Sequence, residues 1–289
     1  MIILDVILSG IVVGGMYALI AMGLNLQYGV ARIMNLSYGE FLMTAAFSTF
    51  WFFTLWKINP LLSLLFSIPV AFIANWLIYR VLLRPLVRRA HSAEQLEGDT
   101  ILATFGLLFL IEGAALLNWG GHFRGYSFLA TPVNILDITF ALNRLLAFAV
   151  ACLLGLAAYW FLRSTRAGTA IRAVAVDAVA AQLVAVDVPR YSAFAFATGG
   201  AMVAASGTLI SMFIAFNPSI GISYTLKALI VIILGGVGHM MGSLVAGLIL
   251  GVAESLGAYL VDPGLTLAIN YAIFVLILLV RPKGLFASK

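Results

Sequence analysis

Charge is scarce in this sequence. Asp, Glu, Lys and Arg together make up 9% of the 289 residues, whereas a soluble globular domain carries about 25%. Hydrophobic residues reach 63%, and the mean hydropathy is +1.12. This composition excludes a soluble enzyme, a disordered chain, a β-barrel and a nucleic-acid-binding protein. The net charge of +5 therefore indicates basic residues that flank membrane helices and face anionic membrane lipid, not nucleic acid.

Residues that carry chemistry are equally few. The single cysteine, Cys152, permits no internal disulfide, and the three histidines are scattered at His91, His122 and His239. The sequence contains no Ser-His-Asp set, no zinc-ligand spacing and no usefully spaced pair of carboxylates. The glycine-rich stretch 235–238 lacks the lysine of a phosphate-binding loop. We therefore expect no catalytic residue, no metal, no cofactor and no ATP hydrolysis by this chain.

What the sequence does contain is a series of apolar runs of about 20 residues, the length that spans the hydrocarbon of a bilayer. They predict an all-α polytopic membrane protein with a single transmembrane domain over residues 1–289. We expect eight or nine transmembrane helices, some broken at glycine. The predicted helices cover residues 4–27, 35–57, 60–83, 100–119, 144–162, 191–213, 226–238, 242–261 and 265–281. The stretch 226–261 is either two short spans or one long broken helix.

Basic residues indicate the orientation. They concentrate in segments 84–99, 163–190 and 281–289, which we therefore expect in the cytoplasm. The loop 120–143, where Asn134 is expected to cap a helix, should lie on the other side. Counting the predicted spans between these segments places the N-terminus in the periplasm and the C-terminus in the cytoplasm. Termini on opposite sides require an odd number of spans, which favours nine.

Small residues recur at helical spacing. Pairs with a GxxxG spacing occur at residues 10 and 14, 238 and 242, and 247 and 251. In lipid such pairs let two helix backbones approach closely. These faces either pack within this subunit or meet a second membrane subunit.

Polar residues inside the apolar runs are candidates for a transport route. Glu40, Glu112 and Glu254 should face the bundle interior, because charge facing lipid is costly. Glu40 is either held ionised by free N–H groups at a helix start or lines a pathway. Glu112 and Glu254 are expected to be structural. Apolar runs broken at glycine often border the substrate route of transporters, and the candidate pathway residues are Asn25, Asn35, Ser37, Glu40, Gly235, Gly236 and Gly238.

The cytoplasmic segment 163–190 has an unusual composition. It is rich in alanine and helical by propensity, and Pro189 should end its helix. Residues 176–187 are expected to form a short helix with Val179, Leu183 and Val186 on one face. That face either packs on the chain's own helices or docks in a groove of a cytoplasmic partner.

Several segments together resemble the permeases of branched-chain amino acid ABC transporters. They are Gly-Gly-Met-Tyr-Ala-Leu at 14–19 and Asn-Leu-Ser-Tyr-Gly-Glu-Phe at 35–41 in the first part of the chain. Thr-Arg-Ala-Gly at 165–168 and Arg-Ala-Val-Ala at 172–175 resemble the coupling loop of that family. Leu-Gly-Gly-Val-Gly at 234–238 and Arg-Pro-Lys-Gly-Leu-Phe at 281–286 resemble its C-terminal half.

The resemblance implies an inner-membrane permease subunit of an ATP-binding cassette importer for branched-chain or other hydrophobic amino acids, working by alternating access. The implied partners are a homologous second permease subunit, two cytoplasmic ATP-binding subunits and a periplasmic substrate-binding protein. Permeases for urea or short amides belong to the same family and remain an alternative, as does an ion-coupled secondary transporter. The residues that would couple to the ATPase are Arg166, Arg172, Asp177, Val179, Ala181, Leu183 and Val186.

Overall fold

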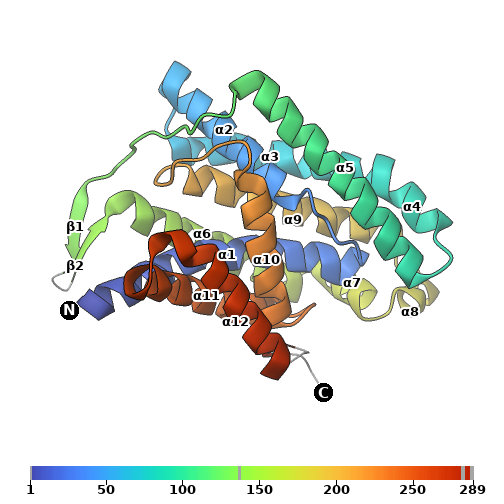
Figure 1. Ribbon diagram of the computed structural model, residues 1–289. Helices are drawn as coiled ribbons and strands as arrows, with labels where there is room; N and C mark the ends of the chain where they lie inside the picture. The colour runs from blue at the N-terminus through green and yellow to red at the C-terminus, as the bar shows by residue number, and fades with distance from the viewer. Residues whose placement is uncertain (1, 136–137, 281–283, 287–289) are drawn as a thin grey trace.

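The computed structural model describes residues 2–135, 138–280 and 284–286, which form a bundle of helices with one short hairpin (Figure 1). The first half contains α1 (Ile2–Ala31), α2 (Tyr38–Trp56), α3 (Pro60–Ile78), a π-helical turn (Tyr79–Leu83), α4 (Arg84–Arg89) and α5 (Ala93–Trp119). Strands β1 (Pro132–Ile135) and β2 (Ile138–Ala141) follow. The second half contains α6 (Leu142–Ser164), α7 (Arg166–Val176), α8 (Ala178–Leu183), α9 (Val188–Ile210), α10 (Ile220–Gly235), α11 (Met240–Leu260), a 3-10 turn (Pro263–Leu265) and α12 (Thr266–Val280).

Each of the nine predicted helices has a counterpart among the described residues. The stretch 226–261 consists of two helices, α10 and α11, separated at residues 236–239. Within the described part of the chain, six helices are long and apolar enough to cross a membrane, and α10 is a shorter apolar helix. The all-α polytopic membrane fold is therefore confirmed, and the count of eight or nine spans stays a prediction.

The loop between α5 and α6 differs from the expectation. It holds the antiparallel hairpin β1–β2, in which Asn134 lies opposite Thr139. Asn134 therefore caps no helix, and its side-chain oxygen accepts a hydrogen bond from the Thr139 hydroxyl at 2.7 Å. The β-branched residues of these two strands favour extended structure. Each strand has only four residues, so the pattern is too short to stand out beside the long apolar runs.

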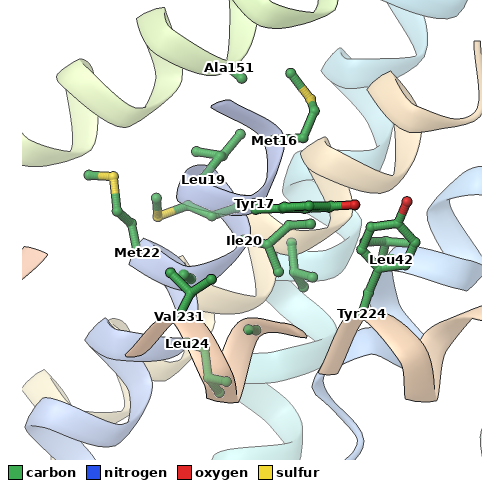
Figure 2. Close-up of a cluster of buried hydrophobic side chains, with 14 of the residues drawn as sticks. Met16, Tyr17, Leu19, Ile20, Met22, Leu24, Leu42, Ala151, Tyr224 and Val231 are labelled. Atoms are coloured by element: carbon green, nitrogen blue, oxygen red, sulfur yellow. The ribbon is translucent and has the colours of Figure 1, made fainter. Parts of the chain in front are cut away.

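Helix α1 forms the centre of the bundle. It packs against α11, α9, α6 and α10, and Met16, Leu19 and Ile20 are each 1% exposed. Figure 2 shows these side chains together with Tyr224 and Val231 of α10. Because residues 14–27 of α1 are all buried, this part of the helix is largely apolar around its whole circumference instead of carrying one apolar stripe.

Close glycine contacts hold α1 in this position. A Cβ atom on Gly251 would collide with the backbone of Gly14, and one on Gly247 would collide with Ala18. Gly235 meets Gly242 in the same way at the turn between α10 and α11. These small-residue faces thus pack within the subunit, the first of the two alternatives that the sequence left open.

Candidate translocation and coupling sites

Asn25 connects α1 to the turn between α10 and α11. Its Oδ1 accepts a hydrogen bond from the backbone N–H of Gly238 at 2.6 Å, and its Nδ2 donates to Oγ of Ser243 at 2.7 Å. Gly236 and Gly238 have φ angles of 95° and 85°, a region that glycine adopts without steric cost. Two predicted pathway residues, Asn25 and Gly238, are therefore in direct contact.

A second polar cluster fixes the connection between α1 and α2. The Oδ1 atom of Asn35 accepts from the Ser37 hydroxyl at 2.7 Å, and its Nδ2 donates to Oε1 of Gln27 at 3.1 Å. Gln27 in turn donates to the backbone oxygen of Phe196 on α9 at 2.8 Å. Because these buried groups satisfy one another, Asn35 and Ser37 hold the connection in place.

Glu40 differs from both clusters. It lies in the first turn of α2 and is fully buried, yet neither carboxylate oxygen has a hydrogen-bond partner among the described residues. The expectation that helix N–H groups would satisfy it is wrong. The Gly39 N–H donates to Oγ1 of Thr225 at 2.8 Å, and the Glu40 N–H donates to the Ser37 carbonyl at 3.1 Å. Buried polar groups nearly always have a hydrogen-bond partner. The Glu40 carboxylate is therefore an exception that lacks a donor among the described residues.

A cavity of about 360 Å³ lies where the ends of α1 and α6 meet α7 and the turn between α10 and α11. Asn25 and Gly238 line it, together with Arg163, Arg172 and His239. The other predicted pathway residues do not line this cavity. The candidate pathway residues therefore lie at separate positions along the bundle and do not form a single site.

A charged cluster that the sequence analysis missed joins α1, α10, α11 and α12. Lys227 forms an ion pair with Glu254 at 2.8 Å and donates to the Tyr17 hydroxyl at 2.7 Å. The Nδ2 atom of Asn270 donates to the other Glu254 oxygen at 2.9 Å. The ammonium also lies 4.6 Å from the ring centroid of Tyr17 and 5.5 Å from that of Tyr224, a cation–π arrangement.

The available signal for this cluster was a lysine within the apolar run 220–235. The predicted helix began at residue 226, which placed Lys227 at its end. Because α10 begins at Ile220, Lys227 lies inside the helix and needs a partner. Glu254 makes helix–helix hydrogen bonds, as expected.

The predicted coupling segment 163–190 contains two short helices, and the helix expected over 176–187 corresponds to the shorter α8. Helix α7 ends at Val176 and α8 begins at Ala178. Between them Asp177 caps α8, and its Oδ1 accepts from the N–H groups of Val179 at 2.8 Å and Ala180 at 3.0 Å. An aspartate is a preferred N-cap residue, so Asp177 sets the break.

The apolar residues of this segment point in different directions. Val179 is 71% exposed and Leu183 is 84% exposed, and Val176 and Val184 are exposed as well. Val186 instead packs against a cluster of the chain's own residues that includes Ala181. Arg166 and Arg172 are exposed. The predicted face therefore loses Val186 and keeps Val179 and Leu183. Ala181, from the wider set of expected coupling residues, is buried.

Comparison with known proteins gives a consistent result. A profile of the family described as "Branched-chain amino acid transport system / permease component" matches residues 6–279. The chain is 30% identical to the high-affinity branched-chain amino acid transport system permease protein LivH of Salmonella typhimurium, over 96% of this chain and 93% of the relative. It is 27% identical to the corresponding protein BraD of Pseudomonas aeruginosa, over 98% and 95%.

A shorter similarity extends to another transport protein. The ribose import permease protein RbsC of Haemophilus influenzae is 28% identical over 43% of this chain and 36% of its own length. No solved structure gives a significant match. Because these matches extend over nearly the whole chain, the chain belongs to the family of permease components of branched-chain amino acid transport systems.

Proposed function

We propose that this chain is the inner-membrane permease subunit of an ATP-driven importer for branched-chain or other hydrophobic amino acids. The observation that carries the proposal is the family match over residues 6–279, together with relatives that are named as permeases for these amino acids. The family is a transport component and not an enzyme. Energy would come from ATP bound by separate subunits, and the helices would alternate between outward and inward access.

The surface for the ATP-binding subunits is the exposed part of α7 and α8. Val179 and Leu183 present apolar side chains there, flanked by exposed Arg166 and Arg172. Burying one such side chain contributes about 1.5–3 kcal/mol. In this proposal Asp177 acts indirectly, because its carboxylate caps and orients α8.

A face on α5 suits the homologous second permease subunit. Gly98, Gly106 and Gly113 follow one another at helical spacing, and among the described residues no atom lies within 4 Å of where their Cβ atoms would be. In lipid, small residues allow a second helix to approach closely. The proposed assembly also includes two ATP-binding subunits and a periplasmic substrate-binding protein.

Glu40 is the pathway residue that we assign to substrate recognition. An amino acid carries an ammonium group, and the Glu40 carboxylate is buried without a donor. A charge-assisted hydrogen bond between the two would be stronger than a neutral one. Gly221 adjoins this carboxylate, where a larger residue would collide with it.

Uptake by cells that lack this chain, with and without the restored gene, tests the proposal. We expect restored uptake of labelled leucine that is inhibited by isoleucine and valine but not by urea or acetamide. Uptake should persist when an uncoupler removes the proton gradient and ATP is maintained. Inhibition by urea would favour the amide alternative, and loss with the proton gradient would favour an ion-coupled carrier.

A further inference from the structure

Five arginines gather where α3 passes into α4 and where α9 begins. Arg80, Arg84 and Arg190 line a cavity of about 260 Å³ together with Trp76 and Asp187, and we call this cavity the arginine pocket. A second hollow, lined by Arg80, Arg84, Pro85, Arg88 and Arg89, adjoins it. None of these residues is among the candidate pathway residues or the named coupling residues, although Asp187 and Arg190 lie at the end of the coupling segment 163–190.

The local sequence explains why these side chains converge. Pro85 has no N–H group, and its ring disfavours an α-helical turn immediately before it. That turn, Tyr79–Leu83, is π-helical, and the Arg84 N–H bonds to the Tyr79 carbonyl. Such turns within helices are frequent at functional sites. Steps of four residues then bring Arg80, Arg84 and Arg88 to one side of the helix.

The arginine pocket carries an excess of positive charge, because three arginines and a single carboxylate line it. Within the described residues, none of its arginines lies within ion-pair distance of a carboxylate. The Nε atom of Arg84 is buried and has no acceptor. Asp187 uses its Oδ1 to accept from the Arg190 N–H at 3.1 Å, as the cap of α9. The N-terminus of that helix adds a positive partial charge of its own.

The position of the pocket indicates which anion it meets. Ile73, Leu77 and Val81, on the helix that precedes α4, are 55%, 46% and 72% exposed, as expected for side chains that face acyl chains. Trp76 lies beside them with the Arg80 guanidinium 5.1 Å from its ring, and tryptophan concentrates at the membrane–water interface. The pocket is therefore at the level where lipid headgroups end and cytoplasmic loops begin.

We propose that the arginine pocket binds the phosphate of an anionic phospholipid of the cytoplasmic leaflet. The planar guanidinium of arginine pairs with two phosphate oxygens at once, and the unused Nε donor of Arg84 would take part. Asp187 lies between α8 and α9, so a bound headgroup would contact the end of the coupling segment. This inference goes beyond the proposed transport activity and rests only on the proposed orientation.

Lipid binding to the full-length chain in phosphatidylcholine nanodiscs tests the proposal. Phosphatidylglycerol is titrated and its retention is measured by native mass spectrometry, with added phosphatidylcholine and inorganic phosphate as separate arms. We expect binding of phosphatidylglycerol alone, weakened about fivefold by Arg84→Gln and about 25-fold by Arg84→Gln with Arg190→Gln. Arg144→Gln, in the first turn of α6 and outside the arginine pocket, is the matched control and should bind as the unmodified chain does.

Arg84→Lys separates a built site from diffuse attraction. It keeps the charge but removes the planar fork and the Nε donor, so we expect binding close to that of Arg84→Gln. Normal binding by Arg84→Lys would overturn the proposal, as would equal retention of inorganic phosphate without lipid. Unchanged lipid binding by the double variant, with loss of the ATP-binding subunits, would assign the pocket to those subunits instead. Melting curves in phosphatidylcholine alone verify that each variant is folded.

Discussion

At the scale of single residues, Glu40 gives the sharpest prediction. Glu40→Gln keeps the size of the side chain and removes its charge, so the substrate ammonium would lose a charge-assisted hydrogen bond worth about 1.5–3 kcal/mol. We expect leucine uptake to fall by roughly tenfold to a hundredfold at unchanged expression, with ATP dependence intact. Uptake of tritiated leucine by membrane vesicles measures this effect.

Glu94→Gln serves as the matched control, because Glu94 is an exposed carboxylate in the first turn of α5, outside the proposed pathway. Its uptake should stay within about twofold of that of the unmodified chain. Leucine uptake by Glu40→Gln within the same range would remove Glu40 from the pathway. Uptake that follows the proton gradient and is lost in this variant would contradict the ATP-driven mechanism.

Lys227 and Glu254 permit a test of stability. Lys227→Met would leave the Glu254 carboxylate without its cation. Breaking a fully buried pair in this way costs about 3–5 kcal/mol, and we expect a smaller loss here because the pair is partly buried. The double variant Lys227→Met with Glu254→Gln should recover most of that loss, because no charge remains uncompensated. Unfolding midpoints in mixed micelles compare these variants with Lys57→Met, an exposed lysine at the end of α2. Equal midpoints for both single variants would contradict the prediction.

At the scale of elements, α8 is the place to test coupling to the ATP-binding subunits. Leu183 is 84% exposed, so Leu183→Asp should leave the permease inserted and stable. In the docked complex the new carboxylate would be desolvated without a partner, at a cost of several kcal/mol. We expect loss of transport and loss of the ATP-binding subunits on co-purification. Full occupancy and normal transport would rule out this docking surface.

Two further variants separate docking from misfolding. Val186→Asp places a charge against Ala181 and its neighbours within the subunit, so this variant should lower the stability of the permease itself. Asn134→Asp, on the β1 strand of the hairpin, should change neither stability nor association. Melting curves and expression levels measured in parallel show which of the two losses each variant suffers.

The same elements show how far the sequence predicts the structure. Apolar runs of membrane length predicted nine of the twelve α-helices that the structure describes. In lipid every backbone polar group must be satisfied internally, which leaves few alternatives to a helix. The break at Asp177 was missed because a single capping residue competes with alanine propensity on both sides. The contact of Lys227 with Tyr17 and the surroundings of Glu40 depend on helices far apart in sequence, as does the hydrogen bond between Gly39 and Thr225. Composition and periodicity carry no information about such contacts.

At the scale of the whole molecule, the two ends of the bundle differ in charge. The hairpin β1–β2 lies near the N-terminus at one end, and α4 and α8 lie at the opposite end (Figure 1). Segments 84–99 and 163–190, rich in arginine, belong to that second end. Because basic segments stay on the cytoplasmic side, we expect the hairpin in the periplasm and α4 and α8 in the cytoplasm.

Single cysteines test this orientation, because Cys152 is the only natural one and Cys152→Ser removes it. In intact spheroplasts a membrane-impermeant maleimide should label Thr139→Cys on the hairpin but not His91→Cys between α4 and α5, both of which are exposed positions. Permeabilised cells should label both. A C-terminal reporter active in the cytoplasm, with an N-terminal tag accessible outside, would require an odd number of spans and so favour nine over eight. Labelling of His91→Cys alone in intact spheroplasts would invert the topology and move α8 away from any ATP-binding subunit.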